Sequence, residues 1–213
     1  MQQIDTPEFA ELMQIHDPLQ QAQPADAGRW NIPKFLVHAS SDGSWLPDSS
    51  RFYFDDLPGE KILRVAPNVS NETLKFYFES ALVTFTRRLQ QRRPLPWLKL
   101  DVQREPEGMM WNIHFSEPPV RVVQWQAHNP VGRDFRLACG LRYQAYDVAF
   151  HQGQSLTVQL HHPASGWTAT YLEATMADGV VMTTAVQVLP DTYPIIRPEQ
   201  QAMACGVRQG NHE

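Results

Sequence analysis

The sequence is poor in several features that define common protein classes. It has two cysteines in 213 residues, Cys139 and Cys205, too few for a disulfide scaffold and without the spacing of a metal site. We expect two thiols in preference to one bridge. No apolar run approaches the ~20 residues that span a bilayer. The first residues also lack the basic start and apolar core of a signal peptide, so the chain as written is predicted to be cytoplasmic, without a membrane span.

Basic residues are also sparse. Eighteen Lys and Arg stand against 23 Asp and Glu, for a formal charge of -5. They cluster only at Arg87-Arg88 and Arg92-Arg93, whereas phosphate binding needs a sustained basic patch, so no nucleic-acid partner is predicted. Both pairs fall at a predicted helix end, where we expect solvated side chains that favour the helix dipole.

The pattern of apolar and polar residues changes near residue 94, and this change predicts two modules. Residues 1–93 alternate apolar runs with helical patterns, whereas residues 94–197 hold short strand-like runs separated by Pro, Gly, Asn and His. Residues 198–213 form a polar stretch, which we interpret as a flexible tail. The composition, 42% hydrophobic and 19% charged, is that of an ordinary globular protein.

The first module follows the pattern of a parallel sheet. Thr6 before Pro7 predicts a helix start, and Lys34–Ala39 reads as a buried parallel strand. A helical turn at residues 47–54, a strand at 61–65 and a long amphipathic helix at 72–91 follow. Two parallel strands cannot form a complete sheet covered on both faces, so we expect part of the sheet to be missing on the N-terminal side.

The second module predicts an all-β fold. About seven short antiparallel strands with Gly and Pro turns favour a two-sheet sandwich of the immunoglobulin or fibronectin type. The predicted strands are Trp97–Gln103, Met110–Phe115, Arg121–His128, Tyr143–Phe150, Ser155–His161, Trp167–Ala177 and Thr183–Leu189.

Several blocks together carry a family resemblance. The most specific is L-P-D-S-S-R-F-Y-F-D-D-L-P-G-E-K, which ends at Lys61. With the other blocks, it makes the chain resemble the PhoPQ-activated pathogenicity-related protein family, from Asp5 to about Pro194. The other blocks are D-T-P at residues 5–7, D-P at 17–18, I-P-K at 32–34, A-P-N at 66–68, N-P-V-G-R-D-F-R at 129–136, G-W-T-A-T-Y-L-E-A-T at 166–175 and T-T-A-V-Q-V-L-P-D-T-Y-P at 183–194.

The resemblance implies a fold and a place for catalysis. It implies α/β plus all-β architecture: the C-terminal part of an α/β-hydrolase-like parallel sheet, followed by the sandwich. A hydrolase triad runs Ser, acid, His, with the Ser on a G-x-S-x-G elbow. Similarity places the acid at Asp42 and the histidine at Asn71. No G-x-S-x-G occurs in the chain, and an amide cannot exchange a proton as imidazole does, so Asp42 is interpreted as a vestigial acid position.

Most of these loop residues can also be interpreted as having a structural role. Asp42 is expected to cap local backbone amides, and Asp48 to favour the start of its helical turn. Ser40, Ser41 and Ser44 are weak substitutes for the nucleophile because none lies on a strand-to-helix elbow.

The remaining polar and aromatic candidates also favour structural roles. His38 is read as a hydrogen-bonded histidine of its strand. His161 and His162 point to opposite faces and lack further ligands, so no metal site is predicted. Arg133 and Asp134 are expected to form a structural salt bridge or turn contact. Four tryptophans could either belong to the core or form an exposed binding platform: Trp97, Trp111, Trp125 and Trp167. We favour the core for Trp125 and Trp167.

We therefore predict a truncated, catalytically inactive bacterial member of the family, a pseudoenzyme without cofactors. Two alternatives remain open: a module that binds a protein or cell-envelope ligand through its sandwich, and the C-terminal half of a split hydrolase. The second would have an N-terminal hydrolase half as its protein partner. The resemblance also implies that full-length members are exported.

Overall fold

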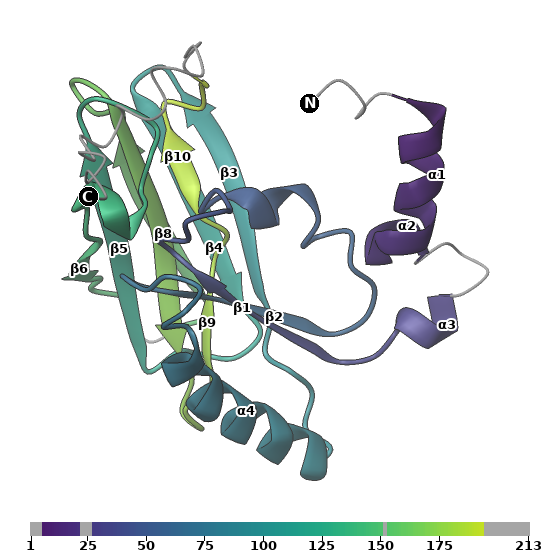
Figure 1. Ribbon diagram of the computed structural model, residues 1–213. Helices are drawn as coiled ribbons and strands as arrows, with labels where there is room; N and C mark the ends of the chain where they lie inside the picture. The colour runs from purple at the N-terminus through teal and green to yellow at the C-terminus, as the bar shows by residue number, and fades with distance from the viewer. Residues whose placement is uncertain (1–5, 22–26, 151–152, 194–213) are drawn as a thin grey trace, which may run out of the picture.

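The computed structural model of the chain describes residues 6–21, 27–150 and 153–193. Within these ranges the fold is mostly β-sheet with few helices (Figure 1). Most strands run antiparallel, and one pair runs parallel. No helix in these ranges is both long and apolar enough to cross a bilayer.

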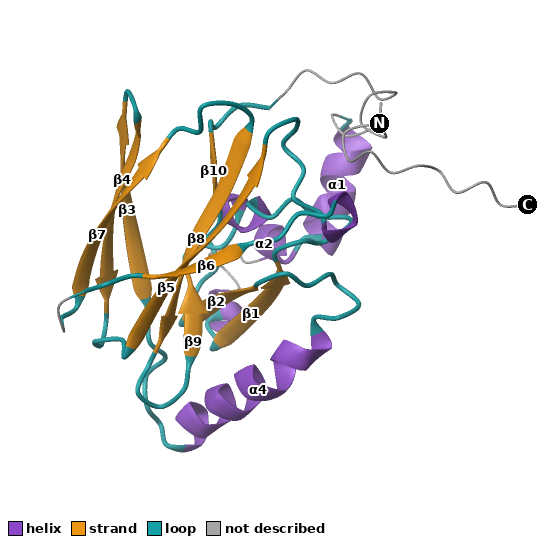
Figure 2. Cartoon of the chain, turned by 90° about the vertical axis from the view of Figure 1, so that its left-hand side faces the viewer, coloured by secondary structure: helices purple, strands orange, loops and turns teal. Residues whose placement is uncertain are grey.

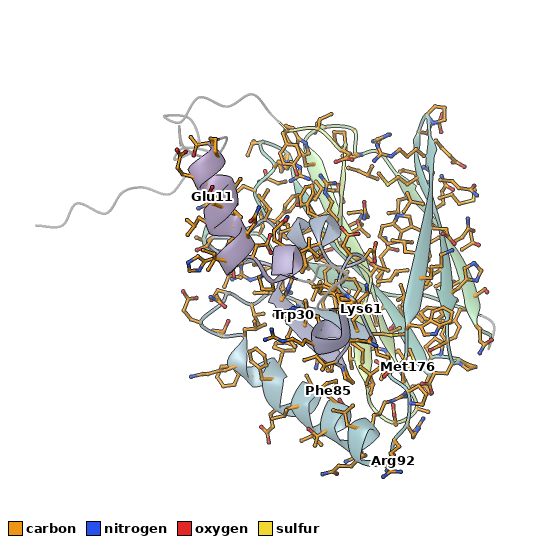
Figure 3. All side chains as sticks on the ribbon, turned by 90° about the vertical axis from the view of Figure 1, so that its right-hand side faces the viewer. Glu11, Trp30, Lys61, Phe85, Arg92 and Met176 are labelled. Carbon is orange, nitrogen blue, oxygen red and sulfur yellow. The ribbon has the colours of Figure 1, made fainter. Side chains whose placement is uncertain are left out.

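The parallel pair consists of β1 (Lys34–Ala39) and β2 (Lys61–Ala66), in register from Lys34 opposite Lys61. The connection between them holds only the 3₁₀ turn η2 (Ser49–Phe52). Helix α4 (Lys75–Gln90) then packs beside β1, and its Phe85 is labelled in Figure 3. The rings of Phe35 and Phe85 meet edge to face, with 5.9 Å between their centroids. The predicted parallel neighbours are therefore confirmed, but in the described residues their sheet has two strands only.

In the described residues before β1 the chain forms three short helices. Helix α1 (Pro7–His16) begins as predicted, because the Thr6 side chain accepts a hydrogen bond from the Phe9 amide at 3.2 Å. Helices α2 (Pro18–Gln21) and α3 (Ala27–Trp30) follow. None of the residues of α1 is buried, and the helix lies apart from the sandwich in Figure 1.

Two antiparallel sheets face each other in the rest of the chain (Figure 2). One contains β3 (Leu98–Glu105), β4 (Gly108–Phe115) and β7 (Ser155–His161). The other has the order β10 (Gln187–Leu189), β8 (Trp167–Thr175), β5 (Arg121–Asn129) and β6 (Gln144–Asp147), with β9 (Val181–Thr183) also paired to β8. Turn η3 (Leu137–Cys139) lies between β5 and β6.

Both sheets supply the core between them. Trp111 and Ile113 of β4 are fully buried in one cluster with Leu172 of β8. This shared cluster follows from the alternation of inward and outward side chains along each strand. Of the tryptophans, Trp111 is fully buried, and Trp125 and Trp167 are partly buried and pack against the buried cluster around Tyr171, on the core side of the two alternatives as expected.

The last predicted strand is divided in two. Residues 184–186 leave the ladder between β9 and β10. The Thr184 amide donates to the Leu172 carbonyl, and the Thr184 hydroxyl accepts from the Leu172 amide at 3.1 Å. A side-chain hydrogen bond thus replaces part of the regular ladder, which is how a threonine competes with backbone pairing.

Strand β2 connects the parallel pair to the sandwich. Ile62 belongs to the cluster around Trp111, and Leu63 and Val65 belong to a second cluster with Tyr171. The Val65 amide donates to the Thr183 hydroxyl of β9 at 3.0 Å. The two regions share their buried clusters. The predicted boundary between two modules at residues 93 and 94 therefore stays a prediction.

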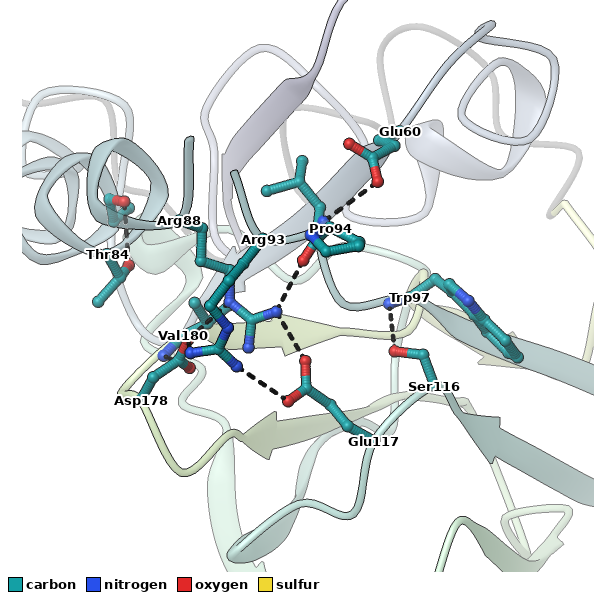
Figure 4. Close-up of polar contacts among 12 residues, drawn as sticks. Glu60, Thr84, Arg88, Arg93, Pro94, Trp97, Ser116, Glu117, Asp178 and Val180 are labelled. Carbon is teal, nitrogen blue, oxygen red and sulfur yellow. Dashed lines mark hydrogen bonds and ion pairs between the residues drawn. The ribbon is translucent and has the colours of Figure 1, made fainter. Parts of the chain in front are cut away.

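The C-terminal end of α4 is fixed by a buried cation. The Arg88 side chain is 3% exposed and forms ion pairs with Asp178 and Glu117, both at 2.6 Å (Figure 4). It also donates to the carbonyl of Pro94 at 2.9 Å. The expectation of solvated arginines is therefore wrong for Arg88, because carboxylates from two sandwich loops reach this helix end. Arg87 is exposed as expected.

Cys139 is disulfide-bonded, so the expectation of two thiols is wrong. The sequence has one other cysteine, Cys205, which lies outside the described residues. A count of two cysteines excludes a scaffold of several disulfides, but it does not decide between one disulfide and two thiols.

Candidate functional site

A pocket of ≈ 520 Å³ lies at the carboxyl end of β1. This end of parallel strands is where α/β proteins usually bind ligands. Asp42 and Asn71, the two positions singled out in the sequence, both line it. The other lining residues are Val37, His38, Ala39, Trp45, Leu46, Pro47, Ser49, Tyr53 and Leu74.

Asp42 is held by its own loop. One carboxylate oxygen accepts hydrogen bonds from the amides of Ser44 at 2.7 Å and Trp45 at 3.2 Å. This is the local capping role expected for an aspartate in such a turn. The described residues contain no ion pair and no histidine hydrogen bond to Asp42, and its second carboxylate oxygen faces no protein donor among them.

Asn71 lines the pocket from the loop that follows β2. It is exposed in the turn that precedes α4, three residues before the buried Leu74. The two sequence positions are therefore brought to one cavity by the parallel pairing of β1 and β2, because the loops that follow neighbouring parallel strands emerge at the same edge.

His38 also lines the pocket, which the sequence did not indicate. Its Nε2 lies 2.8 Å from the Tyr53 hydroxyl, so the prediction of a hydrogen-bonded histidine is confirmed. Burial lowers the pKa of the imidazole, and the nearby Asp42 charge opposes this shift. Burial also raises the pKa of the Tyr53 hydroxyl. The one available signal was the position of His38 directly before the end of β1.

None of the three candidate serines lines the pocket. Ser40 and Ser41 are buried, with their hydroxyl oxygens 3.3 Å apart. The Ser40 hydroxyl also accepts from the Asn68 amide at 2.9 Å. Ser44 is exposed and does not line the pocket, whereas Ser49, which the sequence did not single out, does.

Asp48 and Arg133 anchor the wall of the pocket. Arg133 Nη2 lies 2.6 Å from Asp48 Oδ2, and both side chains are almost fully buried. Arg51 Nε approaches the same oxygen at 3.4 Å. Asp48 is the N-cap residue of η2, and its side chain makes no capping hydrogen bond to the turn, so its dipole role stays a prediction. Arg133 forms the predicted structural salt bridge, with Asp48 as its partner.

The metal and aromatic candidates of the sequence lie outside this pocket. Among the described residues no three His, Cys, Asp or Glu side chains come together to hold a metal ion. His161 and His162 are both exposed. Trp97 is 52% exposed and lies outside this pocket.

Comparison with known proteins adds the family. The sequence model of the PhoPQ-activated pathogenicity-related protein family matches residues 1–136, well over half of the chain. The chain belongs to this family. Both Asp42 and Asn71 fall within the matched residues.

A curated relative is considerably longer. The chain is 26% identical, over 223 aligned residues, to "Autocrine proliferation repressor protein A" of Dictyostelium discoideum. The alignment covers 91% of this chain and 44% of that protein. The chain thus spans less than half of the length of this relative.

Proposed function

We propose that this member of the PhoPQ-activated family is a binding protein without hydrolase chemistry of its own. The observation that carries this proposal is that Asp42 and Asn71 line one pocket, with an amide where an α/β-hydrolase would place its base. A carboxylate in a triad orients a histidine and stabilises its charged form. Asp42 instead binds two amides of its own loop.

The histidine that is present in the pocket does not replace the missing base. His38 Nε2 lies 2.8 Å from the Tyr53 hydroxyl, and among the described residues no serine hydroxyl is hydrogen-bonded to this ring. Its position on β1 differs from the loop in which the family resemblance places the base. The chain also lacks a G-x-S-x-G elbow, the turn that exposes the hydrolase nucleophile.

The test combines turnover with covalent labelling. The purified chain, Asp42→Ala and His38→Ala are compared in hydrolysis of p-nitrophenyl acetate and in labelling by a fluorophosphonate probe, which reacts with activated serines. We expect no labelling, and background hydrolysis that is equal in all three proteins. Hydrolysis that disappears in both variants, together with labelling of a serine in the pocket, would refute the proposal.

A second proposal concerns the fold in which the pocket works. The parallel pair supports an α/β-hydrolase-like sheet that is completed by another polypeptide, as in a split hydrolase. The Lys34 amide donates to the Glu60 carbonyl just before β2, and the Ser40 amide just after β1 donates to the Ala66 carbonyl. The alternate amides of Phe35, Val37 and Ala39 therefore point to the open edge. On α4, the predicted apolar stripe is partly unburied, with Phe78 49% and Leu82 63% exposed.

Both surfaces fit a neighbouring parallel strand with its helix. Such strands need cover on both faces, and an open edge with apolar surface is a template for pairing. Co-expression with a polypeptide that bears parallel βα units should give a stable complex in which the Val37 amide is protected from hydrogen exchange. Unchanged exchange at Val37 in such a complex would exclude pairing at this edge.

The sandwich also supports the finer fold proposed from the sequence. One sheet holds the first, second and fifth strands of the region, and the other holds the third, fourth and sixth strands together with β9 and β10, the two parts of the last predicted strand. We propose that this is a fibronectin-type arrangement, since the sheets divide the strands in this way.

A further inference from the structure

The pocket at the end of β1 carries one unneutralised negative charge. Among the described residues that line it, Asp42 is the one acidic side chain and there is no Lys or Arg, while burial lowers the pKa of the His38 imidazole. Two buried or half-buried loop carboxylates of the chain meet arginines: Asp48 meets Arg133 and Asp178 meets Arg88. Asp42 has no such partner among the described residues and has one carboxylate oxygen directed to no protein donor.

The surroundings of this charge are aromatic and apolar. Trp45, on the same loop, is 70% exposed, and Tyr53 is also part of the lining. Val37 and Leu46 add apolar surface. A carboxylate beside an aromatic face attracts organic cations, through a charged hydrogen bond and through the electron-rich face of the ring.

The size of the pocket limits the ligand. A volume of ≈ 520 Å³ is in the range of sites for small organic molecules. An inorganic cation would leave the apolar wall unused, and it would find one carboxylate where metal sites use several ligands. An anionic ligand would meet Asp42 without any Lys or Arg in the lining.

We propose that this pocket binds a small organic cation, with a primary ammonium group at Asp42 and an apolar body against Trp45. The inference rests on the proposed function, in which the pocket binds without cleaving. The Tyr53 hydroxyl and the Asn71 amide oxygen are the neighbouring acceptors for the remaining ammonium protons. Asn71 thus has a role in recognition that a histidine at this position would fill less well.

The test uses three ligands of the same shape. The affinity of the purified chain is measured by isothermal titration calorimetry for 2-phenylethylammonium, the neutral 2-phenylethanol and the anionic phenylacetate. We expect the ammonium to bind at least tenfold more tightly than the alcohol, which is the effect of one hydrogen bond to a charged group, and the anion to bind least. Added salt should weaken the binding of the ammonium alone.

Matched variants locate the charge and the ring. Asp42→Asn keeps an oxygen for the amides of Ser44 and Trp45 and should remove the preference for the cation. Asp147→Asn, which changes an exposed aspartate of β6, is the control. Trp45→Ala should weaken binding of all ligands, whereas Trp97→Ala, which removes an exposed ring outside this pocket, should not.

The outcomes separate this inference from the proposed function. Equal affinity for alcohol and ammonium, no measurable binding of the ammonium at millimolar concentration, or a cation preference that survives in Asp42→Asn would overturn the assignment of the ligand. Ester turnover that depends on Asp42 would overturn the non-catalytic proposal and leave the calorimetric result unchanged.

Discussion

The buried ion pair between Asp48 and Arg133 should be essential to the stability of the fold. It joins the loop after β1 to the segment after β5, and the two side chains are 0% and 3% exposed. Asp48→Ala removes the carboxylate and leaves the guanidinium of Arg133 in the interior without its partner. Breaking a buried pair in this way costs about 3–5 kcal/mol, because the remaining charge has lost both water and its counterion.

Two contacts set where in this range the loss should fall. The guanidinium of Arg133 stays over the ring of Tyr193, 4.1 Å from its centroid, so part of its stabilisation survives. Arg51, the second cation near Asp48, keeps its ion pair with Asp191 at 2.9 Å. We therefore expect the lower half of the range, about 3–4 kcal/mol, which is a large share of the ~5–15 kcal/mol that stabilises a typical domain.

Urea unfolding followed by circular dichroism measures this loss. Asp147→Ala is the control, because its ion pair with Arg121 is mostly exposed and should contribute at most about 1 kcal/mol. The double variant Asp48→Leu with Arg133→Met should recover much of the stability, since it leaves no buried charge. A loss in Asp48→Ala no larger than in Asp147→Ala would refute the reasoning and place Arg133 in contact with water.

Three further changes test other parts of the fold. Trp111→Ala should destabilise the sandwich by about 3–5 kcal/mol, measured by the shift of the urea midpoint, because Trp111 is fully buried between the sheets. Gly108→Ala should abolish the pairing of β4 with β7, seen as lost amide protection, since the new Cβ would lie 1.8 Å from the Leu160 carbonyl oxygen. The lowered pKa of His38 means that the unfolded chain gains this proton first as pH falls below the ordinary value of 6.5. Stability is therefore full above that pH and lost as pH falls toward the folded pKa, and His38→Gln should reduce this loss in urea titrations at stepped pH.

Local signals in the sequence predicted the elements well. The Thr6-Pro7 start of α1, the bounds of β1 and the bounds of β7 match the structure, because each depends on a cap or on an apolar pattern within a few residues. Asp42 and Asn71 also line the same pocket, as expected for loops that follow neighbouring parallel strands. Here a family resemblance and a topological rule supply the long-range information that local patterns lack.

Contacts between distant residues could not be predicted in the same way. Arg88 is buried by carboxylates that follow it by 29 and 90 positions, Glu117 and Asp178. The hydroxyl of Thr183 is used by β2, more than a hundred residues earlier. His38 reaches the pocket because of where β1 ends and because Tyr53 folds back to it. Such pairs depend on tertiary packing, which carries no periodicity in the sequence.

The open edge of β1 and the pocket are parts of one surface. Val37 and Ala39 line the pocket, and their amides point to the open edge of the strand. A strand that pairs with β1 would therefore add a wall to the pocket and order the same residues. We expect ligand binding and strand pairing to affect each other by equal factors, because coupling between two binding events is reciprocal. The affinity for 2-phenylethylammonium should accordingly change when β1 acquires a partner, and an unchanged affinity would show that the edge and the pocket act independently.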